Sequence, residues 1–200
     1  MVRIALTGGI ATGKSVVAHA LRTAGVPTVD ADQLAREVVR PDTPGLAAVV
    51  GRFGQGVLLP DGRLDRPALG RVVFADVVAR RELEALLHPL VRAGIEAFFA
   101  RLPPGVTGVA EVPLLYETGW VSAFDGAVVT ACRASTQRAR LVLRDGLTEA
   151  AADQRLAAQW PIEDKARLAD AVIVTEGPIA ATRSQAQCLA GWIRGRSSRG

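Results

Sequence analysis

The chain has 200 residues, of which 49% are hydrophobic, and this is enough for one domain with a substantial core. Its net charge of +4 owes most to Arg194, Arg196 and Arg199 near the carboxyl end, so the rest of the chain is nearly balanced and does not indicate a nucleic-acid partner. No apolar stretch reaches the roughly 18 residues of a membrane span, and Cys132 and Cys188 have no neighbours suited to a zinc site or a disulfide framework, so we expect a cytoplasmic protein that contacts no membrane.

Short apolar runs alternate with longer helical patterns along the chain, which is typical of a parallel sheet built from strand–helix–strand units. The apolar runs predict five strands, at residues 2–6, 27–29, 107–112, 126–131 and 171–175. Helices are predicted to begin near Lys14, Asp32, Ser135 and Thr148, with Ser135 and Thr148 as N-caps, and a last one spans about 179–193. The expected fold class is therefore α/β, with three layers and a five-stranded parallel sheet.

A glycine-rich segment between the first strand and the first helix matches the pattern G-x-x-x-x-G-K-[ST] of a phosphate-binding loop. The residues expected to bind the phosphates of a nucleoside triphosphate are Gly9, Ile10, Ala11, Thr12, Gly13, Lys14, Ser15 and Val16. Lys14 would reach the β- and γ-phosphates, and the Ser15 hydroxyl would ligate Mg²⁺. Of the 24 lysines and arginines only Lys14 and Lys165 are lysines, and a slim ammonium group suits the crowded loop better than a planar guanidinium.

Two further segments differ from simple crossovers. Residues of about 41–104 separate the second and third strands, contain helical patterns at 67–74 and 80–87, and are a candidate substrate-binding insert. His88-Pro89 is expected to open another helix there. Residues of about 135–167 are rich in arginine, which favours a lid over transferring phosphates. The expected organisation is one domain, residues 1–200, whose core comprises about 1–40, 105–134 and 168–195.

Charged residues after the strands are the candidates for chemistry, because ligands of parallel sheets bind at the carboxyl ends of the strands. Asp30 and Asp32 follow the second strand, where a carboxylate is placed either to accept a proton or, as an N-cap, only to start a helix. Arg140 and Arg144 share one helix face and suit either a polyphosphate or solvent. Glu111 could orient Mg²⁺ through water or simply end its strand.

A longer series of segments resembles the dephospho-coenzyme A kinase family of P-loop kinases. The series runs in order through Thr7-Gly8-Gly9-Ile10, Asp30-Ala31-Asp32, Leu64-Asp65-Arg66, His88-Pro89, Val112-Pro113-Leu114-Leu115-Tyr116-Glu117, Arg140 to Gly146, and Gln159. The resemblance implies a P-loop kinase core and transfer of a phosphoryl group from ATP to the ribose 3′-hydroxyl of dephospho-CoA. The products are CoA and ADP, and the reaction is the final step of CoA biosynthesis.

The same resemblance implies roles for individual residues. Asp32 would be the catalytic base, and Lys14, Arg140 and Arg144 would stabilise charge on the moving phosphoryl group and bind ATP. The residues implied in holding the acceptor are Asp32, Arg66, His88 and Arg92. Thr175 and Gly177 would lie near the nucleotide base, and the arginine-rich segment would close over ATP as a lid, which excludes water as a competing acceptor.

The chain departs from the family at three places. Ala11-Thr12 stands where Gly-Ser is common, and an alanine is less free than glycine to adopt positive φ. Thr175 replaces a common asparagine, and Tyr116 a common phenylalanine. Two alternatives to the implied activity remain, namely another metabolite or nucleotide kinase with the same core, and a nucleotide-gated binding module that hydrolyses ATP slowly. The sequence indicates no oligomeric state.

Overall fold

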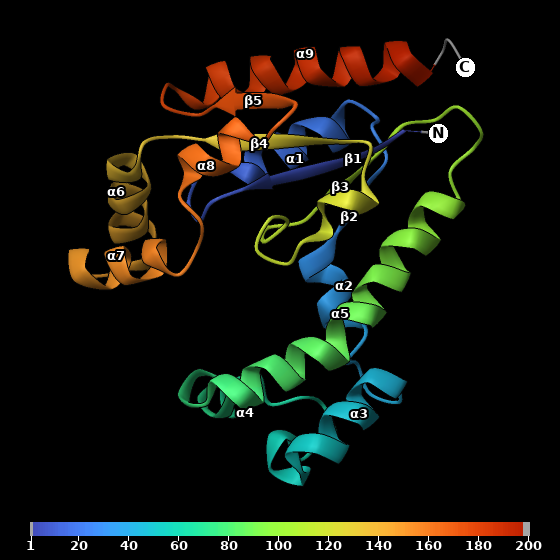
Figure 1. Cartoon of the computed structure of the whole chain (residues 1–200), viewed down its shortest axis with the longest axis vertical. Helices are drawn as coiled ribbons and strands as arrows, with labels where there is room; N and C mark the ends of the chain where they lie inside the picture. Colours follow the sequence, from blue (N-terminus) through green and yellow to red (C-terminus); the bar gives the residue numbers. More distant parts are fainter. Residues whose placement is uncertain (1, 198–200) are drawn as a thin grey trace. The chain divides into compact units, whose positions relative to one another are not determined.

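The structure, a computed structural model, describes residues 2–197 (Figure 1). The chain forms two compact units. The core unit combines the segment that ends at Asp30 with the segment that begins at Arg101, and the helical unit is Ala31–Ala100. The helical unit thus begins about ten residues before the insert expected from the sequence.

A parallel sheet organises the core unit. Within residues 2–197 the sheet has five strands, which confirms the predicted fold class: β1 (Arg3–Gly8), β2 (Thr28–Asp30), β3 (Gly108–Glu111), β4 (Gly126–Ala131) and β5 (Ala171–Val174). Their order is β2-β3-β1-β4-β5, with every pair parallel. In this register Glu111 lies opposite both Leu6 and Asp30, and Gly8 lies opposite Thr130. The carboxyl ends of β1 to β4 therefore meet at one edge of the sheet.

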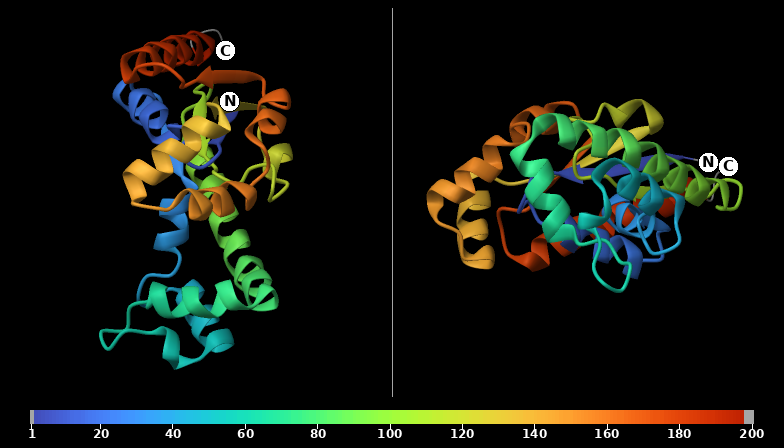
Figure 2. Two further views of the ribbon diagram at one scale, coloured as in Figure 1. Left: turned by 90° about the vertical axis from the view of Figure 1, so that its left-hand side faces the viewer. Right: turned by 90° about the horizontal axis from the view of Figure 1, so that it is seen from below.

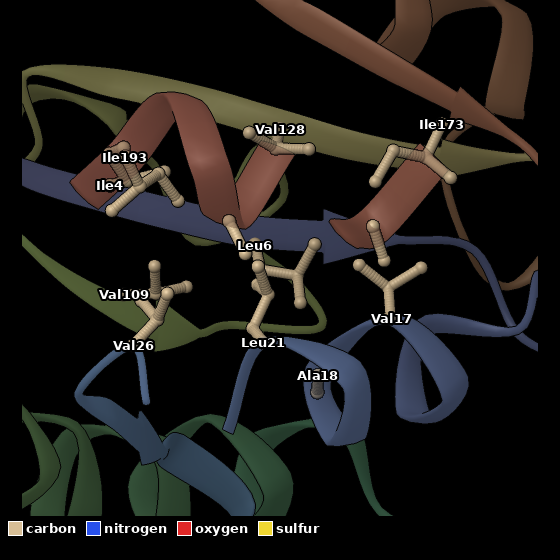
Figure 3. Packing of buried hydrophobic residues seen from close by; sticks show 12 residues of the cluster. Ile4, Leu6, Val17, Ala18, Leu21, Val26, Val109, Val128, Ile173 and Ile193 are labelled. Carbon is tan, nitrogen blue, oxygen red and sulfur yellow. The ribbon is translucent and has the colours of Figure 1, made fainter. Parts of the chain in front are cut away.

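Helices of the core unit surround this sheet. They are α1 (Lys14–Thr23), the 3₁₀ turn η2 (Trp120–Ala123), α6 (Ala134–Asp145), α7 (Glu149–Ala157), α8 (Ile162–Arg167) and α9 (Ile179–Ser197). Helices α1 and α9 contact each other and cover one face, where their Val17, Leu21 and Ile193 pack on Leu6 and Val128 (Figure 3). Helix α8 packs against β4. Helices α6 and α7 lie side by side as a hairpin, which the two views of Figure 2 also show.

The helical unit contains α2 (Ala31–Glu37), α3 (Pro44–Phe53), the 3₁₀ turn η1 (Gln55–Val57), α4 (Arg66–Ala75) and α5 (Val77–Ala100). Its own small core consists of the buried residues Val39, Val49, Val57, Leu69, Val73 and Ala79. Thr43 caps α3 through Leu46 N, and Asp65 caps α4 through Ala68 N. Each unit therefore has its own buried apolar cluster.

Two helix starts predicted from the sequence are wrong. His88-Pro89 does not open a helix but lies inside α5, because buried residues after the proline, such as Val91 and Ile95, keep the helix going despite one missing hydrogen bond. The helix changes direction partway along its length, as expected for an interior proline (Figure 1). Ser135 is not an N-cap, since α6 already begins at Ala134.

In the part of the chain that the structure describes, no helix is both long and apolar enough to cross a bilayer. The cytoplasmic location stays a prediction.

Candidate active site

The loop between β1 and α1 has a backbone that few side chains tolerate. A Cβ on Gly8 would lie 2.2 Å from Thr130 Oγ1 and 2.8 Å from the Thr130 carbonyl oxygen, so glycine is required there. Gly13 precedes α1 with φ +81°. Ala11 also has positive φ, at 59°, where an L-residue is strained. Ala11, which stands where the family commonly has glycine, therefore adopts a backbone conformation that a glycine would adopt at lower cost.

Threonine hydroxyls hold this loop from inside the sheet edge. Thr12 Oγ1 donates to the Gly9 carbonyl oxygen at 2.7 Å and lies 2.8 Å from Thr130 Oγ1 at the end of β4. Thr175 Oγ1, just beyond β5, donates to the Thr12 carbonyl oxygen at 2.8 Å. All three threonines are buried. Thr12 and Thr175, expected at the ATP site, thus lie at the loop and use their hydroxyls to fix its backbone.

Two glutamines from the arginine-rich segment hold the backbone of one loop residue. Gln137 Nε2 of α6 donates to the Ile10 carbonyl oxygen at 2.7 Å, and Gln159 Oε1 accepts from the Ile10 N–H at 2.8 Å. A Cβ on Gly9 would lie 2.7 Å from Gln137 Nε2, so Gly9, which follows the first glycine of the motif, makes room for this amide. The expected lid segment is therefore bonded to the phosphate loop at Ile10.

Arg140 and Arg144 have different surroundings although they lie one turn apart on α6. Arg140 donates to the Ala11 carbonyl oxygen at 3.1 Å and to Thr175 Oγ1 at 3.2 Å, and also to the Thr175 carbonyl oxygen. The structure therefore brings Arg140 to the loop. Arg144 is exposed and donates to Asp145 at 2.7 Å and 3.0 Å, a hydrogen bond that lowers the pKa of the Asp145 carboxyl.

Lys14 faces a buried carboxylate at the end of β3. Its Nζ lies 3.4 Å from Glu111 Oε2, while Arg22 of α1 pairs with Glu111 Oε1. Glu111 is only 3% exposed, so these two cations compensate its charge in a site of low polarity. Two positive charges against one negative charge leave a net positive charge beside the loop, which suits an anionic ligand.

The donors around the loop also fit a magnesium ion. Ser15 is exposed in the first turn of α1, and Glu111 lies beside Lys14. Throughout residues 2–197 no group of three or more His, Cys, Asp or Glu side chains could hold a metal by itself. Mg²⁺ usually keeps several waters and binds one or two protein oxygens together with phosphate oxygens. The exposed Ser15 hydroxyl could supply one such protein oxygen.

The candidate base and the candidate acceptor residues all belong to the helical unit. Asp32 is the exposed second residue of α2, so it does not occupy the N-cap position that the capping interpretation gave it. Arg66 is the first residue of α4. His88 and Arg92 are four residues apart on α5 and share one face of that helix.

Other residues complete the site. Gly177 follows the exposed Glu176 in the turn after β5, and a Cβ on Gly177 would meet no atom closer than 3.9 Å. Sequence reasoning missed that Thr130 and Gln137 contact the loop and that Arg22 pairs with Glu111. The one available signal was a polar residue, Gln137, at a position of α6 that is otherwise suited to an apolar side chain.

Comparison with known proteins agrees with this geometry. The family model for dephospho-CoA kinases matches residues 2–181. A dephospho-CoA kinase from Anaeromyxobacter dehalogenans is 50% identical over 198 residues, which cover 98% of this chain and 94% of the relative. The crystal structure of the protein TT1252 from Thermus thermophilus has a TM-score of 0.79 at 33% identity, covering 95% of this chain and 97% of that chain. The dephospho-CoA kinase from Campylobacter jejuni has a TM-score of 0.73 at 27% identity, covering 96% and 98%. The chain therefore belongs to the dephospho-CoA kinase family.

Proposed function

We propose that the protein transfers the γ-phosphoryl group of ATP to the ribose 3′-hydroxyl of dephospho-CoA. The hydroxyl oxygen forms the new bond to phosphorus, the bond between the γ-phosphorus and the β,γ-bridging oxygen breaks, and ADP leaves with the bridging oxygen. Family membership supports the choice of acceptor. The observation that carries the proposal is the loop itself, which is held by buried hydrogen bonds in a conformation with two positive-φ residues, Ala11 and Gly13, ahead of a helix N-terminus.

On the donor side, the amides of residues 9–16 hold the phosphates of ATP and Lys14 binds the β- and γ-phosphates as a point charge. Binding of the nucleotide exchanges the Glu111 partner of Lys14 for phosphate oxygens. Mg²⁺, when bound, neutralises charge on the phosphates, and Ser15 would hold it directly while Glu111 would act through water. Thr175 and Gly177 lie at the side of the base.

Arg140 and Arg144 of α6 act at different stages of the reaction. Arg140, already bonded to the loop backbone, fixes Ala11 and Thr175 around the nucleotide. Arg144 has an exposed carboxylate partner, Asp145, which it can exchange for a phosphoryl oxygen when the α6–α7 hairpin closes. Two guanidinium groups would then stabilise the charge that spreads over the transferred group.

On the acceptor side, Asp32 takes the proton of the ribose hydroxyl as that oxygen attacks phosphorus. Arg66, His88 and Arg92 bind the acceptor through its phosphate groups. The helical unit therefore recognises dephospho-CoA, while the core unit binds ATP.

The activity is tested by incubating the protein with ATP, Mg²⁺ and a panel of acceptors, namely dephospho-CoA, nucleoside monophosphates, shikimate and gluconate. We expect stoichiometric formation of ADP with dephospho-CoA alone. Preference for another acceptor would indicate a different kinase with this core, and ATP turnover that no acceptor changes would indicate a nucleotide-gated binding module.

The role of Asp32 is tested by Asp32→Asn, which removes the proton acceptor and keeps the size of the side chain. We expect kcat to fall by about 10²-fold or more while ATP affinity stays unchanged. Near-normal kcat would leave Asp32 with a role in the first turn of α2 only. Asp30→Asn is measured alongside, because Asp30 ends β2 two residues earlier and is the other candidate for the base.

A further inference from the structure

Lys165 is the second of the two lysines in a chain that otherwise uses arginine, and the proposed reaction assigns it no role. Its side chain is fully buried in α8, and its Nζ lies 2.6 Å from Glu117 Oε1 in an ion pair whose angle falls outside hydrogen-bond geometry. Glu117 Oε2 and Lys165 Nζ are buried without a hydrogen-bond partner among the described residues. A buried ion pair whose polar atoms lack hydrogen-bond partners contributes little to the stability of the fold, so stability alone does not explain this pair.

Glu117 connects this pair to the main chain next to the active site. The Trp160 N–H donates to Glu117 Oε1 at 3.1 Å, and the Trp160 ring stacks on Tyr116 with ring centroids 6.3 Å apart. One carboxylate oxygen thus receives both the charge of Lys165 and a backbone hydrogen bond. The segment after β3, the chain before α8 and the helix α8 itself are fixed at this point.

The next residue along the chain reaches the phosphate loop. Gln159 precedes Trp160, and its Oε1 accepts the Ile10 N–H at 2.8 Å. A cavity of about 120 Å³ lies against Gly9, Gln137, Gln159 and Trp160, so hydrogen bonds more than close packing hold the loop on this side. Gln159 therefore joins the chain at Trp160 to the Ile10 peptide of the loop.

We propose that Lys165 is a positioning residue for ATP binding, acting through Glu117, the Trp160 backbone and Gln159 to hold the Ile10 peptide of the phosphate loop. The inference rests on the proposed function only in taking the loop as the ATP site. A lysine suits the position because a slim ammonium group on an unbranched stem fits a site with no solvent access, whereas a guanidinium is broader and needs more partners.

The test is a double-mutant cycle on ATP affinity, measured by calorimetry with MgATP and without any acceptor. Lys165→Met keeps an unbranched side chain that is one atom shorter and removes its charge, and Gln159→Ala removes the acceptor for Ile10 N–H. Each change is expected to raise the Kd for ATP about three- to tenfold, the worth of one hydrogen bond. The double variant is expected to bind ATP no more weakly than Gln159→Ala, because both changes break one path.

A structural role alone predicts a different pattern. Ile193→Ala in α9 is the matched control, because Ile193 is also buried and belongs to the apolar cluster of Leu6 and Val17, which includes no residue of the path. It should lower Tm and leave the Kd for ATP unchanged. The proposal is overturned if Lys165→Met behaves like Ile193→Ala, or if the effects of Lys165→Met and Gln159→Ala on Kd multiply.

If Lys165→Met does not fold, the same cycle is run with Lys165→Met combined with Glu117→Gln, which removes both buried charges and is expected to fold. An unchanged Kd for ATP in that background would also overturn the proposal. Because no acceptor is present, failure of this inference and failure of the proposed kinase activity are separate results.

Discussion

The phosphate loop and the α6–α7 hairpin are neighbours along one sheet edge, but different forces hold them. The loop is fixed by buried hydrogen bonds from Thr12, Thr175 and Gln137. The hairpin is held by ion pairs of exposed arginines, among them Arg138 with Asp153 at 2.6 Å and Arg155 with Asp145 at 3.2 Å. Breaking a buried hydrogen bond is costly, whereas an exposed ion pair contributes about 0–1 kcal/mol.

Helix α6 belongs to both regions. Its Gln137 and Arg140 bond the loop backbone, while Arg138, on another side of the helix, and Arg144, one turn beyond Arg140, pair with carboxylates of the hairpin. The protein's own hydrogen bonds thus hold the loop, and the outer part of the hairpin can exchange its partners at little cost. The proposed phosphoryl transfer would use both properties, because the phosphates of ATP would need a fixed loop and the γ-phosphate would need cations that can change partners.

The largest expected effect comes from the cation inside the loop. Lys14→Ala should lower kcat/KM by about 10²- to 10³-fold and weaken ATP binding, since it removes a charge aimed at the transferred phosphoryl group. Steady-state kinetics and calorimetry measure the two quantities. Lys14→Arg should not restore activity, because a planar guanidinium crowds the loop. Unchanged turnover in Lys14→Ala would contradict the role assigned to this lysine.

The fixed geometry of the loop is tested next by Gly8→Ala. The new Cβ would meet Thr130 Oγ1 at 2.2 Å and the Thr130 carbonyl oxygen at 2.8 Å, and backbone cannot yield as a side chain can. We expect a loss of about 3 kcal/mol, or about 6–12 °C in Tm. Gly51→Ala is the control, since a Cβ there meets nothing within 4 Å and α3 favours alanine. Equal Tm values for both variants would mean that the loop is not tightly held.

Because the ion pairs of the hairpin can exchange partners, we expect Arg138 and Arg144, which both make such pairs, to differ in function. Arg138→Ala and Arg144→Ala each remove an exposed ion pair and should change the free energy of unfolding by less than about 1 kcal/mol. Arg144→Ala alone should lower kcat, by about tenfold to a hundredfold, because it loses a charged hydrogen bond to the phosphoryl group. Equal kinetics for the two variants would place Arg144 outside the reaction.

The sequence predicts the phosphate loop itself but not the side chains that hold it in place. The loop was predictable because its requirements are local: two glycines, one lysine and one serine at fixed spacing after an apolar strand. Its supports were not, because Thr175 and Thr12 are 163 residues apart and nothing in their spacing indicates contact. The strands were found to within about two residues, since buried parallel strands are short apolar runs.

Helix ends depended more on tertiary contacts than on local signals. Thr148 caps α7 as predicted, through a hydrogen bond from Ala151 N at 3.2 Å. Ser135 does not cap α6, because Glu176 beyond β5 accepts from the Arg133 N–H and so serves the same end of the helix. Pro89 gives a second example. A local rule predicts that a helix begins at a proline, but α5 continues through Pro89 because apolar residues that follow it are buried.

A smaller effect is expected from relieving the strained residue in the loop. Ala11→Gly removes the cost of φ 59° for an alanine but adds conformational freedom to the unfolded chain. The first term is larger, so we expect a gain of about 1 kcal/mol, or about 2–4 °C in Tm. Thermal unfolding without nucleotide measures it. A lower Tm would show that the surrounding hydrogen bonds, and not the side chain, set this backbone conformation.

The smallest effect concerns the junction between the two regions, where Glu176 accepts from the Arg133 N–H and from Thr136 Oγ1 at the start of α6. The Arg133 backbone hydrogen bond lowers the pKa of the Glu176 carboxyl. A depressed pKa in the folded state stabilises the protein above the unfolded value of about 4.3, and the gain disappears as pH falls through the lower folded value.

Glu176→Gln keeps an oxygen acceptor but cannot carry this charge. The Tm of the unchanged protein should therefore exceed that of Glu176→Gln slightly at about pH 7, and the difference should shrink between about pH 5 and pH 3 as the carboxylate is protonated. Thermal unfolding of both proteins across that range measures the difference. A gap in Tm that stays constant down to about pH 3 would mean that the charge of Glu176 does not hold the start of α6, and the hairpin would then depend on the loop only through Gln137 and Arg140.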